Sequence, residues 1–200
     1  MKTLLQLVLI QMFALINSDV FGQWGVTAGL NTYQARQHSL VGEIQAKPNV
    51  QFGANWTSRP FSSIRNLGFR AETQIISKGY RQKIRDEIYS TTFSYWGLMP
   101  TVRYQIVEAI GIHSGFELNF MIGTNSENGI SLYRAIECAA VFGLDIVPQK
   151  TISYFLRGSY GLTPVLNYPV MDPIEGIIGQ RRDLYLFGFL AGVQININNR

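Results

Sequence analysis

Apolar and polar residues alternate along the stretch 110–123, which reads IGIHSGFELNFMIG. Nearly all of its even positions are large and apolar, whereas its odd positions are small or polar. Because side chains two residues apart share one face of an extended chain, this period of two predicts a β-strand. One face of the strand therefore contacts an apolar medium, and the nature of that medium decides the fold class.

The same alternation identifies seven further strands, so the sequence predicts eight, an even number. Their approximate ranges are 24–31, 50–57, 67–75, 91–106, 136–146, 152–162 and 185–197. The stretch 91–106 is less regular, because Phe93 and Tyr95 have the opposite parity to its later apolar residues. A bulge near Gly97 or Pro100 would place both aromatic residues on the apolar face with the rest.

The connections between these strands alternate in length, at roughly 15, 8, 12, 3, 9, 4 and 20 residues. Barrels of the bacterial outer membrane combine an even strand count with long extracellular loops and short periplasmic turns. The pattern therefore predicts an all-β, eight-stranded antiparallel up-and-down transmembrane barrel with both termini in the periplasm.

A soluble β-sandwich is the alternative, with its apolar faces packed inward and its polar faces in water. The strand lengths favour the barrel, because they exceed the five or six residues usual in globular sheets. Aromatic residues also gather at both ends of the apolar faces, among them Trp24, Tyr154, Phe93 and Tyr95, as in the aromatic belts of membrane proteins. We therefore expect the apolar faces to meet lipid and the polar faces to line the lumen.

The composition indicates a surface that is not fully exposed to water, since only 15% of residues are charged and 19 are glycine. The segment 1–22 has a lysine near its start, an apolar centre and small residues before Gln23, which is typical of a cleaved secretory signal peptide. The remaining 23–200 form one predicted barrel domain. The net charge of +4 is too small to favour nucleic acid as a partner.

The polar faces carry both cations and anions in nearly equal numbers. Charges inside a narrow barrel must be paired, so we expect the arginines to interleave with Glu72, Glu117 and Glu137 and to plug the lumen. The predicted lumenal network consists of Arg70, Glu72, Arg103, His113, Glu117, Glu137 and Arg157. A narrow water or proton path is the alternative interpretation.

The sequence predicts no catalytic site, cofactor or specific metal site. His113, Ser114 and Glu117 suggest a hydrolase, but adjacent strand residues point to opposite faces, so His113 and Ser114 cannot act together. With two histidines and one cysteine in the chain, ligands for a metal are not clustered.

The outward loops are predicted to be basic and to lie near phosphate groups of outer-membrane lipid, including lipopolysaccharide; ordinary solvated loops are the alternative. The basic loop residues are Lys78, Arg81, Lys83, Arg85, Arg181 and Arg182. The segment 163–182 is long for a connector, so it is the expected contact surface for a protein partner.

Five motifs resemble the PorT-like outer-membrane barrel family of the Bacteroidetes: GVTAGLNT, AETQIISKGYRQK, YWGLMPTVRY, GIHSGFELNFMIG and FGFLAGVQIN. The resemblance covers nearly all of 23–200 and implies an eight-stranded up-and-down barrel. It also implies a role in a secretion and gliding apparatus, as for the name-giving member, and it supplies no catalytic residues.

Three functions follow from these patterns. The first is a non-enzymatic outer-membrane barrel with a plugged lumen, whose loops contact lipid or envelope proteins such as a secretion system. The second is a porin-like pore for small solutes, and the third is a lipid-modifying enzyme.

Overall fold

The computed structural model describes residues 22–36, 43–58, 66–126, 133–148, 150–172, 176–181 and 184–197. The predicted signal peptide lies outside these ranges except for Gly22. The described strands are β1 (Gln23–Arg36), β2 (Glu43–Thr57), β3 (Leu67–Ile84), β4 (Glu87–Val107), β5 (Ile110–Thr124), β6 (Ile136–Ile146), β7 (Ile152–Gly161), β8 (Tyr168–Asp172), β9 (Gly176–Arg181) and β10 (Tyr185–Asn196). No helix among the described residues is long and apolar enough to cross a bilayer.

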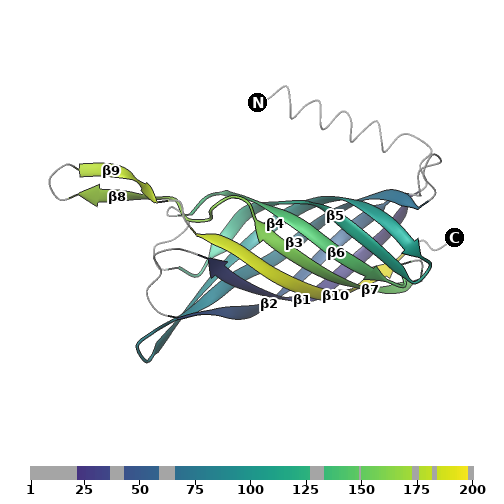
Figure 1. Ribbon diagram of the computed structural model, residues 1–200, viewed down its shortest axis with the longest axis horizontal. Helices are drawn as coiled ribbons and strands as arrows, with labels where there is room; N and C mark the ends of the chain where they lie inside the picture. Colours follow the sequence, from purple (N-terminus) through teal and green to yellow (C-terminus); the bar gives the residue numbers. More distant parts are fainter. Residues whose placement is uncertain are drawn as a thin grey trace, which may run out of the picture.

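Eight of the strands form a closed antiparallel barrel in the order β1-β10-β7-β6-β5-β4-β3-β2 (Figure 1). Each strand pairs with its neighbour in sequence, apart from the β8–β9 hairpin inserted between β7 and β10. Closure comes from β1 and β10, which pair from Gly25 with Asn196 to Arg36 with Tyr185. The predicted fold class is confirmed.

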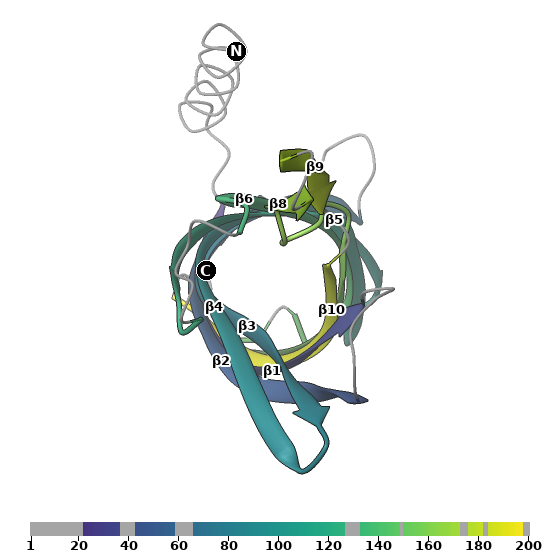
Figure 2. The same ribbon diagram turned by 90° about the vertical axis from the view of Figure 1, so that its left-hand side faces the viewer.

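The two ends of the barrel differ. At one end, which we call the turn end, β1 begins, β10 finishes, and Glu108 and Ala109 alone join β4 to β5. At the other, the loop end, β3 and β4 extend past the barrel wall as a projecting hairpin, and the β8–β9 hairpin also lies beyond the barrel (Figures 1 and 2).

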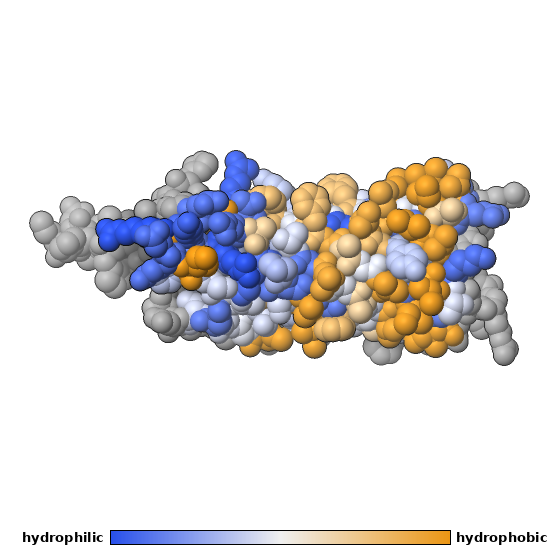
Figure 3. Space-filling view, turned by 90° about the horizontal axis from the view of Figure 1, so that it is seen from below, coloured by the Kyte–Doolittle hydropathy of each residue, from blue (hydrophilic) through white to orange (hydrophobic). Residues whose placement is uncertain are grey.

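On the face seen in Figure 3, the outer surface is mostly apolar over the turn-end half and mostly hydrophilic toward the loop end. Along β5, for example, Ile112, Phe116 and Leu118 are exposed, while His113 and Glu117 are buried. The same inversion recurs on the other barrel strands. In hydrocarbon this arrangement buries the polar side chains and solvates the apolar ones, so the barrel has the exterior of a membrane-spanning protein.

The prediction of a long loop after the third strand is wrong. β3 and β4 continue to Ile84 and Glu87, and only Arg85 and Asp86 join them; Arg85 adopts a positive φ of 56°. Strand pairing persists because β3 and β4 hydrogen-bond to each other beyond the barrel wall, where both faces can be polar. The change from apolar to polar residues in the sequence therefore indicates where the apolar belt ends, and not where the strand ends.

The predicted outward position of Phe93 and Tyr95 is also wrong. Both are fully buried inside the barrel, on the same face of β4 as Arg103. The β4–β5 pairing has irregularities between Ser94 and Tyr95 and between Gln105 and Val107, and not at Gly97 or Pro100. Parity along β4 is unbroken from Phe93 to Arg103, and an apolar cluster inside the loop end explains the aromatic residues.

Glycines allow close approach between neighbouring strands on the inner face. A Cβ at Gly115 would lie 2.1 Å from the carbonyl oxygen of Pro100, whereas one at Gly123 would meet nothing nearer than 3.9 Å. We expect Gly115→Ala to destabilise the barrel by about 1–3 kcal/mol, because the β4 backbone must shift. Gly123→Ala is the control and should unfold like the wild type in urea, as measured by intrinsic fluorescence in lipid vesicles.

Candidate functional site: the closed lumen

Charged side chains fill the lumen in balanced numbers. Among the described residues, the buried cations are Arg70, Lys78, Arg103 and Arg157, and the buried anions are Glu72, Glu117, Glu137 and Asp145. They arise at alternate positions of the strands, because every second residue points inward. β3 alone supplies Arg70, Glu72, Gln74 and Lys78 in steps of two or four residues.

Asp145 on β6 is the centre of the cluster nearest the turn end. Its two carboxylate oxygens accept hydrogen bonds from both terminal nitrogens of Arg70, at 3.1 and 2.9 Å. Arg103 Nε lies 3.2 Å and His113 Nδ1 3.3 Å from Oδ2 of the same carboxylate. One anion therefore compensates two guanidinium groups and contacts an imidazole.

Glu72 and Arg157 form the middle layer. The guanidinium donates to both carboxylate oxygens, at 3.1 and 2.7 Å, and Thr27 adds a third hydrogen bond at 3.0 Å. Arg157 also lies over the ring of Phe155, 4.2 Å from its centroid. Because β3 and β7 lie opposite each other in the ring of eight strands, this ion pair crosses the full width of the lumen.

Lys78 forms the layer nearest the loop end. Its Nζ lies 2.9 Å from Glu137 Oε2 and 3.4 Å from Glu117 Oε1. Neutral donors add to these contacts: Gln74 donates to Oε1 and Ser159 to Oε2 of Glu117, and Asn119 donates to Oε2 of Glu137. The prediction that Lys78 belongs to an extracellular loop is wrong, since its side chain is 0% exposed.

An apolar cluster, here called the aromatic cap, fills the loop end above Lys78. Its buried residues are Tyr33, Ala35, Ile76, Tyr80, Phe93, Tyr95, Val165, Leu184 and Leu186. Lys78 Nζ lies 4.9 Å from the ring centroid of Tyr33 and 5.8 Å from that of Tyr95. The cap therefore joins the charged layers through cation–π contacts and covers them.

All seven predicted lumenal residues are buried inside the barrel, but the predicted pairing is only partly right. Arg157 pairs with Glu72 as expected. Arg70 and Arg103 contact Asp145 in place of a glutamate, and Glu117 and Glu137 pair with Lys78. Extending the alternation of the third strand past Ile76 would have predicted that Lys78 points into the lumen. The role of Asp145 as a shared acceptor could not be predicted in this way, because it depends on which side chains meet across the lumen.

The other residues predicted to form basic loops lie outside the lumen or outside the described side chains. Arg81 and Lys83 are exposed on the projecting β3–β4 hairpin, with Arg85 at its turn. The hairpin is not purely basic, because Glu43 lies opposite Lys83 and Asp86 and Glu87 complete the tip. Arg181 ends β9 with a side chain that the structure does not describe, and Arg182 lies outside the described residues.

The hydrolase interpretation requires His113 and Ser114 to meet, and the structure separates them. His113 is buried beside Asp145, whereas Ser114 is exposed on the outer face. Within the described parts of the chain, acidic, histidine and cysteine side chains form no group suited to a metal ion.

No protein-family model matches the sequence, and a comparison with curated proteins finds no match. Among solved structures the chain is similar to Ail, the attachment invasion locus protein of Yersinia pestis, in complex with the heparin analogue sucrose octasulfate. The identity is 11%, the TM-score is 0.49, and the match covers 88% of this chain and 99% of Ail.

Two further similar structures are Neisserial surface protein A and OprG from Pseudomonas aeruginosa. The first has 12% identity and a TM-score of 0.47, with 87% of this chain and 97% of that chain covered. The second has 10% identity and a TM-score of 0.46, with 88% and 96% covered. Similarity at this level concerns the fold, and the barrel itself is established by the strand pairing described above.

Breaking the ion pair that crosses the lumen should destabilise the barrel. We expect Glu72→Gln to lower the free energy of unfolding by about 3–5 kcal/mol, because it leaves the buried Arg157 charge without its partner. The double variant Glu72→Gln/Arg157→Met should recover much of that loss, since no unpaired charge remains. Urea titrations of both variants and of Arg157→Met in vesicles give the coupling energy, and purely additive losses would contradict a direct pair.

Proposed function

We propose that this chain is a non-enzymatic barrel protein of the bacterial outer membrane, with a closed lumen and with a loop end that contacts envelope partners. The observation that carries the proposal is the inverted barrel: an apolar exterior surrounds an interior of paired charges beneath the aromatic cap. In a bilayer, closure of the sheet provides hydrogen-bond partners for the backbone groups at both sheet edges. The paired charges stabilise a core without a continuous water column.

The proposed orientation places the turn end in the periplasm and the loop end outside. It follows the rule that bacterial barrels have short periplasmic turns and longer extracellular extensions. The structure offers connections of both kinds: Glu108 and Ala109 at the turn end, and the projecting β3–β4 hairpin and the β8–β9 hairpin at the loop end. This orientation puts both ends of the barrel domain on the periplasmic side.

The closed lumen argues against the pore as the main function. Ion pairs span the lumen at three levels, and the cap residues Phe93, Tyr95 and Leu184 are fully buried. An eight-stranded barrel has little interior space beyond its side chains. A structural core is therefore favoured over a route for solutes.

Ionic conductance tests the closed lumen. Purified wild-type protein inserted into planar bilayers should give no sustained stepwise current, whereas an open porin examined under the same conditions should. Regular conductance steps from the wild type would overturn the plugged lumen and favour the small-solute pore.

The projecting β3–β4 hairpin is the proposed contact surface for a protein partner, with membership of a secretion assembly as the specific hypothesis from the PorT-like resemblance. Its tip combines charges of both signs with the exposed apolar residues Ile88 and Tyr89. A mixed surface of this kind is better suited to a protein than to lipid phosphate alone. Exposed apolar residues beyond the membrane belt are the expected centre of such a contact.

Chemical cross-linking in intact cells tests this surface. We expect Lys83→Glu/Ile88→Ser to abolish any cross-linked partner of the wild type, because these residues lie opposite each other in the β3–β4 register. Lys150→Glu, exposed at the turn end, is the matched control and should retain the partner. Equal recovery from both variants, or the absence of any partner of the wild type, would count against the hairpin as an assembly surface.

A further inference from the structure

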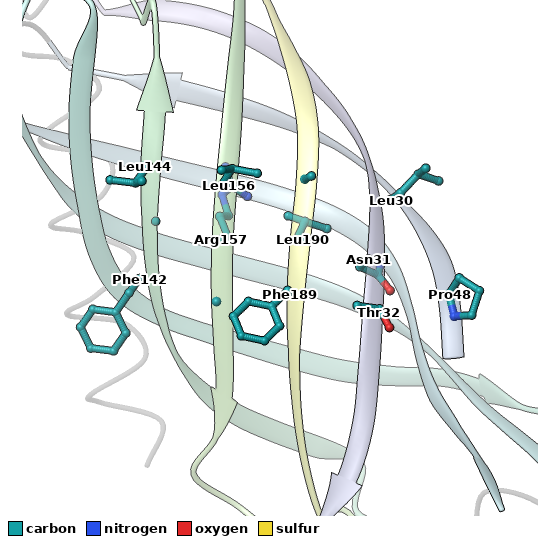
Figure 4. Close-up of a pocket in the computed structure, with 13 residues that line it drawn as sticks. Leu30, Asn31, Thr32, Pro48, Phe142, Leu144, Leu156, Arg157, Phe189 and Leu190 are labelled. Atoms are coloured by element: carbon teal, nitrogen blue, oxygen red, sulfur yellow. The ribbon is translucent and has the colours of Figure 1, made fainter. Parts of the chain in front are cut away.

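A hollow interrupts the lipid-facing surface where β1, β10, β7 and β6 lie side by side (Figure 4). It has a volume of about 670 Å³, and apolar atoms form nearly all of its lining. Figure 4 shows Phe142 and Phe189 on either side of β7, with Leu144 and Leu156 nearby. The hollow therefore lies within the apolar belt, and not in the lumen.

Gly158 on β7 is one of the residues that line the hollow. The strand register places Gly158 between Phe142 on β6 and Phe189 on β10 in one outward-facing row. Both rings are strongly exposed, at 62% and 69%. A Cβ on Gly158 would lie 3.9 Å from Cε1 of Phe189 and 4.0 Å from the carbonyl oxygen of Phe142, which is ordinary van der Waals contact, so this position accepts a side chain without a clash. Two protruding rings with no side chain between them leave a slot at the centre of the row.

A cation and a phenol lie just above this slot. Tyr160 is the next outward residue of β7 toward the loop end, and its hydroxyl accepts a hydrogen bond of 3.4 Å from Arg36 Nη1 on β1. Both side chains are exposed. Two residues of a strand span roughly 7 Å, so Tyr160 follows Gly158 directly along the outer face of β7, and the Arg36 guanidinium reaches its hydroxyl. Arginine and tyrosine at the edge of an apolar belt can both donate hydrogen bonds to a phosphate.

We propose that this surface is a specific binding site for the lipid A portion of lipopolysaccharide. One acyl chain fills the slot over Gly158 between Phe142 and Phe189, and a phosphate group binds Arg36 and the Tyr160 hydroxyl. The proposal rests on the orientation given under Proposed function, because the loop end must face the leaflet that contains lipid A. Charge complementarity and orientation together point to this occupant: an apolar slot with an arginine at one end matches an acyl chain attached to a phosphate-bearing headgroup, and lipid A is such a lipid in the leaflet that the loop end faces.

Native mass spectrometry of the detergent-solubilised full chain, titrated with purified lipid A, tests the proposal. The wild type should bind one lipid A. Gly158→Leu should weaken binding about tenfold or more, because the leucine fills the slot, and Arg36→Gln should weaken it several-fold through loss of the charge. Ala54→Leu is the matched control, since it adds the same side chain to the outward face of β2, away from the slot, and it should bind like the wild type.

Each other outcome has a definite meaning. Unchanged lipid A binding by Gly158→Leu overturns the site, and so does equal retention of phosphatidylcholine by the wild type, which would show that the phosphate contact gives no selectivity. Preference for phosphatidylglycerol, or a wild-type dimer that Gly158→Leu dissociates, would assign the surface to a different occupant and overturn the proposal. Heat-modifiable migration on gels tests whether each variant is folded, and a Cβ at Gly158 makes no close contact that would prevent folding. The closed lumen and the hairpin are tested separately by conductance and cross-linking, so failure here leaves those results intact.

Discussion

Closure of the sheet is the constraint on which the rest of this structure depends. In hydrocarbon an unpaired backbone N–H or C=O group costs several kcal/mol, and an open sheet would expose a whole edge of them. The pairing of β1 with β10 removes both edges at once. Closure then divides each strand into one face toward lipid and one toward a narrow interior, so the position of every side chain follows from its parity.

Closure of the sheet encloses a polar interior whose charged side chains must be paired. A lumen of eight strands is too narrow for bulk water, yet it must be filled by side chains of the polar faces. Four cations and four anions among the described residues achieve this in three layers, around Asp145, around Glu72 and Arg157, and around Lys78. Each layer joins strands that are not neighbours, and the Glu72–Arg157 pair connects opposite walls. The aromatic cap replaces charge with apolar packing where the barrel leaves the membrane.

The chemical character of the outer surface changes along the barrel axis, from the turn end to the loop end. The belt near the turn end contacts lipid without interruption by charge, while the hollow over Gly158 and the Arg36–Tyr160 pair form one structured feature at its upper edge. Above it, the β3–β4 hairpin extends into solvent with charges of both signs and with exposed Ile88 and Tyr89. The proposed lipid site at the belt edge and the proposed protein contact at the hairpin are therefore compatible on the same barrel, because the two surfaces lie at different levels and on different strands.

The sequence by itself determined the number and antiparallel order of the barrel strands and the faces of most of them, because a period of two and chain connectivity are local properties. It did not predict the β8–β9 hairpin beyond the barrel. It also determined which polar residues lie in the lumen, as for Arg70, Glu72 and Arg157. Only the tertiary structure decided which charges meet, since the pairing of Arg70 with Asp145 and of Lys78 with Glu137 depends on the shear and width of the closed barrel. The same holds for Phe93 and Tyr95: alternation reports two faces, but an aromatic residue is stable both in lipid and inside an apolar cap, and only the closed barrel shows which environment each one occupies.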